Sequence, residues 1–367
     1  MKNFSEELND IRRFYESDEF KNKINNIRSL FFGKPLILHG AGELGFKIAS
    51  VLKYHDIDIT CFFDNNREGI CTETGLEIVP PYNYADANII ICSLAHSDAI
   101  KRHLNALGIS NDRIFCNDKR RFSNKQLLNI PEMTFQDIEK HISGYQRSYD
   151  LFKEDKSKQI FIERIKWYLF SSSITHSPPN NQYFDPEIIN LTENEVFVDG
   201  GIGRFGSATK SFLEFVNNQY DHCYGFEPDI NNFTKVQRIF NETPDFTLTN
   251  KGLWGNETLL NFKSGFNSSS KLDDLGREVE VTSLDTFFSD KNPPTLIKLD
   301  VEGAEFCALE GTERIIKKHK PKLAICVYHK PEDLYTLPEL VKSYRDDYRF
   351  YLRHYTDAGH ETVFYAI

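Results

Sequence analysis

The chain has 367 residues, of which 27% are charged and 40% are hydrophobic, a balance typical of globular proteins. This length usually divides into two domains. The formal net charge of −10 argues against a large nucleic-acid interface, because such an interface needs basic residues to replace counterions.

The cysteines and the apolar runs indicate the cellular setting. None of the seven cysteines forms a CxxC pair and several lie inside apolar runs, so we expect reduced thiols and a cytoplasmic protein. Residues 1–20 lack the apolar core of a signal peptide. No uninterrupted apolar run reaches the roughly 18 residues that a membrane-spanning helix needs, so no membrane span is expected.

The first part of the chain alternates between strand and helix patterns. Apolar spacing predicts one or two leading helices over 4–31. The remaining pattern predicts strands over 35–40, 58–64 and 88–94, and helices over about 43–53 and 97–107. Because strands that alternate with helices form parallel sheets covered on both faces, we expect a Rossmann-like α/β domain over residues 1–120.

A change of pattern separates this part from a second α/β region. Residues 121–180 are polar and helical in pattern, so we expect a helical connector there. Strands are then expected over 195–199, 223–227, 247–250, 295–300 and 322–329. The runs 349–355 and 361–367 predict a hairpin, so the last strand should be antiparallel. We therefore place a second domain at 181–367.

The first glycine turn, HGAGELG, has the spacing of a dinucleotide-binding fingerprint. Gly40, Gly42 and Gly45 follow a predicted strand, and Asp64 ends the next one. Such glycines let the backbone approach a pyrophosphate, while the acid binds ribose hydroxyls. No acid precedes the glycines, so a phosphate is tolerated. The alternative is a turn that only closes the fold.

The second glycine turn, DGGIGRFG, differs because Asp199 precedes Gly200, Gly201 and Gly203. A carboxylate beside a pyrophosphate costs several kcal/mol at an effective dielectric constant of about 20. It suits a ligand with a cationic end, such as S-adenosylmethionine (SAM). Glu227 ends the following strand and is placed to accept ribose hydroxyls. The alternative is a capping Asp199 and a surface Glu227.

The segment TLIKLDVEGAE contains a group of carboxylates. Asp300 ends a predicted strand, where ligands gather in open parallel sheets, and Glu302 and Glu305 follow. The two glutamates share a face if a helix starts at once. Three carboxylates can orient a hydroxyl, take its proton or hold a divalent cation. The alternative is a helix N-terminus decorated with acids.

Two histidines are candidates for the base that removes a proton from a hydroxyl. His329 ends a predicted strand and His354 lies in the penultimate one. Their ordinary pKa of about 6.5 suits the role, although either is equally a structural histidine. A metal bound by Asp300 with His329 or Glu305 is a further alternative. Residues 182–184 either line a pocket or pack at the sheet edge.

Several of these stretches together resemble the FkbM family of SAM-dependent methyltransferases. VFVDGG, GFEPD, TSLDTF and IKLDVEGAE occur in the family's order, and the resemblance covers about 182–367. It implies a class I methyltransferase fold with a seven-stranded sheet, SAM as donor and a hydroxyl as acceptor. By position, Asp199, Gly201 and Glu227 hold SAM. Ile202, Gly203 and Arg204 differ from the residues that often follow DGG in relatives of this branch.

Residues 33–116 resemble a small Rossmann-like domain associated with nucleotide sugars, through GAGELG, CFFDNN and GLEIVPP. We therefore expect an O-methyltransferase that acts on a sugar, glycan precursor or related metabolite, with a nucleotide sugar as the N-terminal ligand. One alternative is an NAD(P)-dependent oxidoreductase or epimerase that uses the first glycine turn. Another is a non-catalytic nucleotide-sugar-binding protein.

Overall fold

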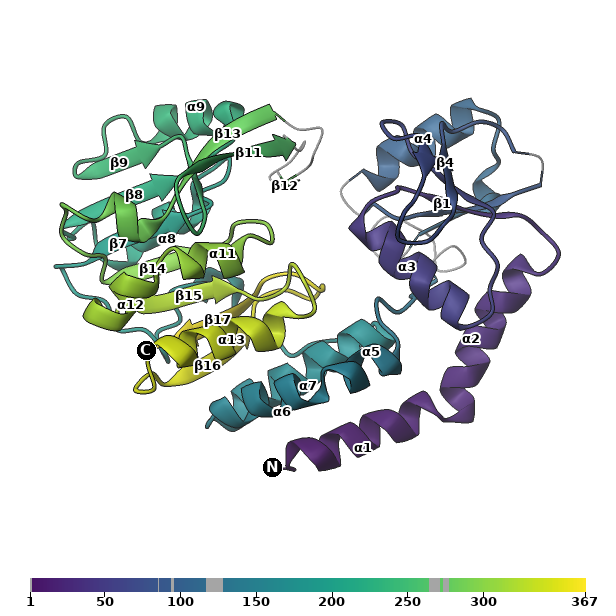
Figure 1. Ribbon diagram of the computed structural model, residues 1–367, viewed down its shortest axis with the longest axis horizontal. Coiled ribbons are helices and arrows are strands. Elements are labelled where there is room, and N and C mark those ends of the chain that lie inside the picture. Colours follow the sequence, from purple (N-terminus) through teal and green to yellow (C-terminus); the bar gives the residue numbers. More distant parts are fainter. Residues whose placement is uncertain (1, 85, 94–95, 117–127, 264–270, 273–276) are drawn as a thin grey trace. The chain divides into compact units, whose positions relative to one another are not determined.

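The computed structural model describes residues 2–84, 86–93, 96–116, 128–263, 271–272 and 277–367. The chain divides into two compact units (Figure 1). The N-terminal unit comprises residues 2–142 and 165–172, and the C-terminal unit comprises residues 143–164 and 173–367. Helix α7 (Asp155–Phe170) contributes residues to both units. The domain boundaries predicted at residues 120 and 180 stay predictions.

The N-terminal unit contains a six-stranded sheet of order β3-β4-β2-β1-β5-β6. Its strands are β1 (Leu36–His39), β2 (Cys61–Phe63), β3 (Gly69–Ile70), β4 (Glu77–Val79), β5 (Asn88–Ile91) and β6 (Ile114–Cys116). The edge strand β3 is antiparallel to β4, and the other pairs are parallel. Its helices are α1 (Phe4–Tyr15), α2 (Asp18–Phe31), α3 (Glu43–Tyr54), α4 (Ser97–Ala106), η1 (Asn111–Arg113) and α5 (Phe135–Lys140).

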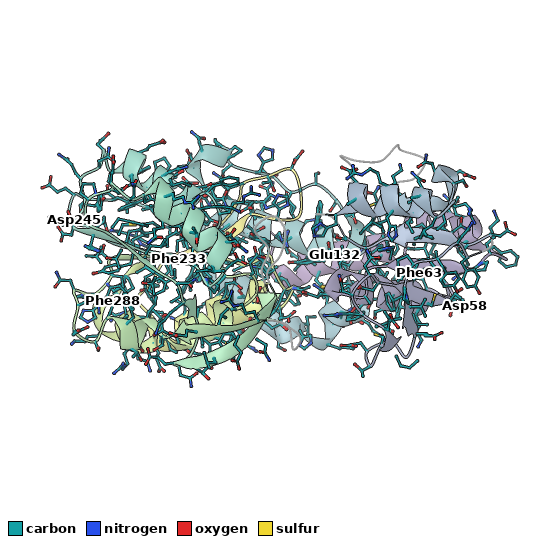
Figure 2. All side chains as sticks on the ribbon, turned by 90° about the horizontal axis from the view of Figure 1, so that it is seen from above. Asp58, Phe63, Glu132, Phe233, Asp245 and Phe288 are labelled. Carbon is teal, nitrogen blue, oxygen red and sulfur yellow. The ribbon has the colours of Figure 1, made fainter. Side chains whose placement is uncertain are left out.

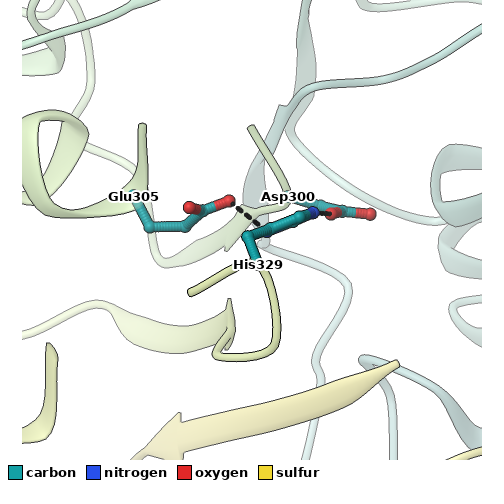
Figure 3. A group of neighbouring side chains, drawn as sticks. All are labelled: Asp300, Glu305 and His329. Atoms are coloured by element: carbon teal, nitrogen blue, oxygen red, sulfur yellow. Dashed lines mark ion pairs between the residues drawn. The ribbon is translucent and has the colours of Figure 1, made fainter. Parts of the chain in front are cut away.

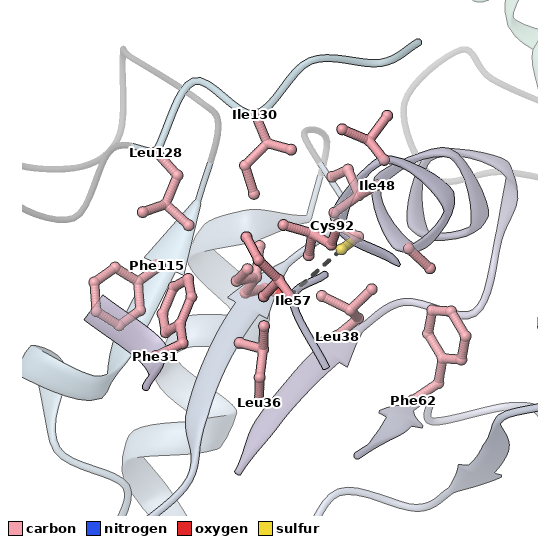
Figure 4. Close-up of a cluster of buried hydrophobic side chains, with 14 of the residues drawn as sticks. Phe31, Leu36, Leu38, Ile48, Ile57, Phe62, Cys92, Phe115, Leu128 and Ile130 are labelled. Carbon is pink, nitrogen blue, oxygen red and sulfur yellow. Dashed lines mark hydrogen bonds between the residues drawn. The ribbon is translucent and has the colours of Figure 1, made fainter. Parts of the chain in front are cut away.

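Both faces of this sheet are covered. β1 and β5 are buried at every position, which explains why they are apolar except at His39 and Asn88. Successive residues of β1 enter different clusters: Leu36 and Leu38 pack with Phe31 and Phe115 (Figure 4), whereas Ile37 packs on the other side. The predicted strands and helices of this unit are confirmed, with boundaries shifted by a few residues.

The C-terminal unit contains a seven-stranded sheet of order β16-β17-β15-β14-β7-β8-β9. Its strands are β7 (Val196–Gly200), β8 (His222–Phe226), β9 (Phe246–Thr249), β14 (Leu296–Leu299), β15 (Lys322–Cys326), β16 (Phe350–His354) and β17 (Thr362–Ala366). β17 is antiparallel to both of its neighbours, while the other pairs are parallel. The predicted seven-stranded, mostly parallel sheet with an antiparallel last strand is therefore confirmed.

Helices and packed aromatic rings complete this unit. The helices are α6 (Ile142–Leu151), η2 (Pro179–Asn181), α8 (Ser207–Phe215), α9 (Ile230–Ile239), α10 (Leu284–Phe287), α11 (Glu305–Glu310), α12 (Glu313–His319) and α13 (Asp333–Tyr344). Aromatic rings fill the core: Phe197 stacks on Phe212 of α8 with ring centroids 4.5 Å apart. Phe288, which is labelled in Figure 2, packs edge-on against Tyr224 with ring centroids 5.0 Å apart.

Two features of this unit differ from the expectation. A four-stranded sheet of β10 (Gly252–Leu253), β11 (Thr258–Lys263), β12 (Lys271–Leu272) and β13 (Arg277–Thr282) was not predicted, although REVEVT alternates as a half-buried strand does. The strand predicted over 322–329 ends at Cys326, so His329 lies on a loop. All seven cysteines are free thiols. Among the described residues, no helix is both long and apolar enough to cross a bilayer.

Candidate functional site

A buried ion pair lies beneath the second glycine turn. Asp199 of β7 and Lys298 of β14 are partners in the parallel register, and Lys298 Nζ lies 2.9 Å from Asp199 Oδ1. Thr209 Oγ1 donates a hydrogen bond to Asp199 Oδ2 at 2.7 Å. Burial lowers the pKa of Lys298, but Asp199 and Asp300 outweigh burial and raise that pKa above its ordinary value. The ammonium group therefore stays charged.

This ion pair corrects the expectation that Asp199 offers a free negative charge to a cationic ligand. The Asp199 side chain is fully buried, and both of its carboxylate oxygens already have partners. Lys298 also donates to the carbonyl oxygens of Gly200 at 3.1 Å and Gly201 at 2.8 Å. Asp199 thus holds the lysine that fixes the turn. The sequence signal was the lysine inside TLIKLD, because lysine is almost never buried without a partner.

Gly201 brings the glycine turn against the acidic segment. Its φ of 75° lies in the left-handed region, and a Cβ atom at this position would lie 1.9 Å from the backbone oxygen of Asp300. Glycine satisfies both requirements. The backbone N–H of Asp300 donates to the oxygen of Gly200 at 3.0 Å. Two motifs that are distant in the sequence are therefore joined through their backbones.

Glu227 follows β8 and closes the same turn. Its Oε2 accepts the N–H of Gly203 at 3.0 Å, and its Oε1 accepts the N–H of Asp229 at 2.9 Å. Burial raises the pKa of Glu227 to about 7, although the two N–H donors oppose this shift. Among the described residues, no atom lies within 4 Å of the Cβ position at Gly203. This side of the turn therefore has room for a ligand, and each Glu227 oxygen keeps a lone pair for a hydroxyl donor.

The predicted carboxylates gather at the carboxyl end of β14. Asp300 follows the strand, Glu302 lies in a turn with a φ of 57°, and Glu305 begins α11. The condition for a shared helical face of Glu302 and Glu305 is not met, because the helix begins only at Glu305. The Glu305 side chain is fully buried, whereas Asp300 and Glu302 are 22% and 26% exposed. Asp300 and Glu302 are therefore the carboxylates that a solvent-borne ligand reaches.

His329 lies between Asp300 and Glu305 (Figure 3). Its Nδ1 is 3.0 Å from Glu305 Oε1, and its Nε2 is 3.5 Å from Asp300 Oδ1 and 3.6 Å from Glu302 Oε2. Burial lowers the pKa of the imidazole, but the three carboxylates outweigh burial and raise that pKa to about 10. The ring is then protonated at neutral pH, which does not favour the predicted role of His329 as the base.

Two tyrosines fix the orientation of Asp300. The hydroxyl of Tyr183 donates to Asp300 Oδ2 at 3.0 Å, and that of Tyr328 donates to Oδ1 at 3.2 Å. Burial raises the pKa of Asp300, but Lys298, His329 and the Tyr183 hydrogen bond outweigh burial and lower it. Asp300 is therefore an ionised carboxylate in a fixed orientation. Tyr183 belongs to the segment 182–184 noted above, whereas sequence reasoning missed Tyr328.

His354 is placed differently from His329. It ends β16 with 0% exposure, and its Nδ1 lies 2.8 Å from Thr362 Oγ1. Burial lowers its pKa to about 3. An enclosed imidazole that stays neutral has no contact with solvent, so the expected catalytic role of His354 is not supported. The geometry agrees with the structural alternative.

The N-terminal glycine turn connects β1 to α3. Gly40 has a φ of 117°, and a Cβ atom on Gly45 would lie 2.0 Å from the Gly40 oxygen, so the helix packs closely on the turn. Both carboxylate oxygens of Asp64 accept backbone N–H groups, one of them from Ala41 of the turn at 2.9 Å. Asp64 therefore stabilises the turn through these hydrogen bonds. Nucleotide binding by Gly40, Gly42, Gly45 and Asp64 stays a prediction.

The C-terminal unit thus combines a mostly parallel seven-stranded sheet with a glycine turn and carboxylates at one edge. Residues 198–357 match the family model of the methyltransferase FkbM domain. Methyltransferase FkbM from Methylobacillus flagellatus KT shares the fold, with a TM-score of 0.61 and 20% sequence identity over 95% of this chain and 98% of that chain.

Weaker structural matches cover about half of the chain. An rRNA methylase from Streptococcus thermophilus has a TM-score of 0.32 and 16% identity, over 48% of this chain and 87% of that chain. A fibrillarin from Aeropyrum pernix in complex with natively bound S-adenosyl-L-methionine has a TM-score of 0.31 and 12% identity, over 49% and 70%. The comparison with curated proteins finds no match.

Proposed function

We propose that the C-terminal unit is a SAM-dependent O-methyltransferase that acts on a hydroxyl of a sugar, glycan precursor or related metabolite. The main support is the joined pair of motifs at one sheet edge: the turn closed by Glu227 and the segment that begins at Asp300, in contact through Gly201. Ligands of open parallel sheets bind at this edge. The match to the methyltransferase FkbM domain supports methyl transfer. The sugar part depends on the resemblance of residues 33–116.

The residues at this edge fit SAM. Glu227 would accept the ribose hydroxyls, and the open side of the turn at Gly203 would face the ligand. When bound, SAM supplies a methyl group whose bond to the sulfonium sulfur breaks as its bond to the acceptor oxygen forms, which leaves a thioether and releases the hydroxyl proton. Asp199 contributes through Lys298, which holds the carbonyl groups of the turn.

The acidic segment supplies the acceptor side of the site. Asp300 is held by Tyr183 and Tyr328, so its carboxylate can orient an acceptor hydroxyl towards the donor. The proton of that hydroxyl passes to Asp300 or to Glu302, the two partly exposed carboxylates, and from there to solvent. Turnover by Asp300→Asn and Glu302→Gln would separate these two assignments.

SAM binding tests the proposal directly. We expect the full-length chain to bind SAM and S-adenosylhomocysteine in isothermal titration calorimetry. Glu227→Ala should weaken binding by about 10- to 100-fold, because hydrogen bonds to a charged group contribute about 1.5–3 kcal/mol. The exposed Glu242 offers a matched control, and Glu242→Gln should bind as the wild type does. Absence of binding to the wild type at tens of micromolar would remove the proposed function.

The pH dependence of SAM binding should report Glu227. Its pKa of about 7 means that the folded, ligand-free protein keeps this carboxyl largely protonated below neutral pH. Ribose hydroxyls donate to the ionised form, so affinity should increase with pH, by at most about tenfold per unit below pH 7, and level off above it. The charged neighbours are Asp229, which raises this pKa, and Lys298, which lowers it.

The control is Glu227→Gln, measured by calorimetry between pH 5.5 and 8.5. Titration of SAM itself affects both proteins equally, so the ratio of the two dissociation constants isolates the carboxyl group. A ratio that stays constant across this range would contradict the assignment of Glu227 to the ribose.

A further inference from the structure

His329 combines deep burial with a ring nitrogen that lacks a hydrogen bond. Its side chain is 6% exposed, and within the described part of the chain both of its ring nitrogens are buried without a hydrogen bond of good geometry. Of the two, Nε2 faces Asp300 Oδ1 at 3.5 Å and Glu302 Oε2 at 3.6 Å. Both distances are too long for a good hydrogen bond. They match the roughly 3–4 Å that separates two ligand atoms when each lies about 2.0–2.2 Å from one cation.

The other ring nitrogen, Nδ1, lies beside a carboxylate that is fully buried rather than partly exposed. Nδ1 lies 3.0 Å from Glu305 Oε1, which also accepts the backbone N–H of Val301 at 2.8 Å. The Glu305 side chain is fully buried and therefore cannot swing away. Histidines that bind metals usually donate their second N–H group to such a carboxylate, which fixes the tautomer and aims the other nitrogen. A cation bound at Nε2 would replace the proton that this nitrogen carries in its absence.

We propose that His329 Nε2, Asp300 and Glu302 form a binding site for one divalent cation, with Glu305 as the residue that positions the imidazole. Asp300, Glu305 and His329 each offer a ligand atom within 4.8 Å of the others, and we assign Glu305 to orientation because it faces the opposite ring nitrogen. One imidazole and two carboxylates suit Mn²⁺ or Zn²⁺ better than Mg²⁺ or Ca²⁺, which prefer oxygen ligands alone.

The cation would let the acidic segment bind an acceptor hydroxyl through the metal ion. Asp300 and Glu302 are partly exposed, so the ion keeps coordination positions open towards solvent. A hydroxyl bound there would be placed and made more acidic. This consequence rests on the proposed methyl transfer, whereas the cation site itself does not.

Mn²⁺ binding to the full-length chain, stripped with EDTA and free of SAM, tests the site. Electron paramagnetic resonance reports the loss of the signal of free Mn²⁺, and we expect about one bound ion per chain. His329→Gln, Asp300→Asn and Glu302→Gln each alter a ligand, so each should weaken binding by more than the roughly 10- to 100-fold that loss of an outer-shell partner costs. Glu305→Gln should weaken it less, because an amide oxygen still accepts the Nδ1 proton. Glu310→Gln, at the exposed end of the same helix, should have no effect.

Two results would overturn the inference: no Mn²⁺ or Zn²⁺ binding by the wild type, or wild-type binding by both His329→Gln and Glu302→Gln. Loss of binding in Glu305→Gln equal to that in Asp300→Asn would overturn the division into ligands and positioning residue. Circular dichroism checks the fold of each variant, and the partly exposed Glu302 provides a variant that does not disturb the core. SAM calorimetry in EDTA separates a failure of this site from a failure of the proposed function.

Discussion

Asp300→Asn is expected to lower methyl transfer by about 100- to 10,000-fold, the usual range for a residue that orients a reacting hydroxyl or takes its proton. The asparagine keeps the shape of the side chain but loses its negative charge and one acceptor oxygen. Tyr183 and Tyr328 each donate to a different oxygen of Asp300, so the amide group leaves one of them facing N–H donors. SAM affinity should stay close to that of the wild type, because the cofactor contacts are assigned to Glu227.

The measurement combines two assays on the full-length chain. Transfer of a labelled methyl group from SAM to a panel of nucleotide sugars and glycan precursors reports turnover, and calorimetry reports SAM affinity. Asp290→Asn, with a side chain that is 79% exposed, is the matched control and should keep both quantities. If Asp300→Asn retains more than about a tenth of wild-type turnover with saturating SAM and acceptor, the general acid–base range is not reached, and Asp300 is not the orienting group.

Lys298→Met should destabilise the C-terminal unit by about 3–5 kcal/mol, because it leaves the buried carboxylate of Asp199 without its charge partner. Methionine keeps the apolar stem and roughly the volume, so the loss is electrostatic. Lys298 also donates to Gly200 and Gly201, and its removal frees two carbonyl groups of the turn. We therefore expect weaker SAM binding in addition to the lower free energy of unfolding.

Urea unfolding followed by circular dichroism measures this effect. The double variant Asp199→Asn/Lys298→Met should recover a large part of the lost stability, because it also removes the buried charge that the single variant leaves without a partner. Lys318→Met, on the exposed surface of α12, is the control and should change stability by less than about 0.5 kcal/mol. A loss below about 1 kcal/mol for Lys298→Met would mean that solvent reaches Asp199.

Much of the site follows from pattern and position. Asp199, Glu227 and Asp300 each stand at the end of a predicted strand, and the strands alternate with helices. Because parallel strands place their carboxyl ends at one edge, three acids from separate segments were expected to meet there. The turn at Gly201 does join the segment at Asp300, as this logic requires.

The sequence pattern did not predict the charged neighbours of the site residues. Asp199 looked like a free anion at the tip of a strand, yet Lys298, 99 residues later, lies 2.9 Å from it. His329 looked like a base with an ordinary pKa, yet burial, which lowers that pKa, is outweighed by three surrounding carboxylates, which raise it to about 10. The start of α11 at Glu305, which separates Glu302 from Glu305, also depends on the path of the chain around the cluster.

The alternation of apolar strands and helices is a local property, so the printed residues alone specify a parallel sheet and the acids at its edge. Whether each of those acids pairs with a lysine, accepts a hydrogen bond from a tyrosine or contacts solvent depends on residues that are close only after folding. Interactions between charges grow stronger as the distance and the local dielectric constant fall. A lysine within 3 Å in a dry interior therefore neutralises a carboxylate that would otherwise be available to a ligand.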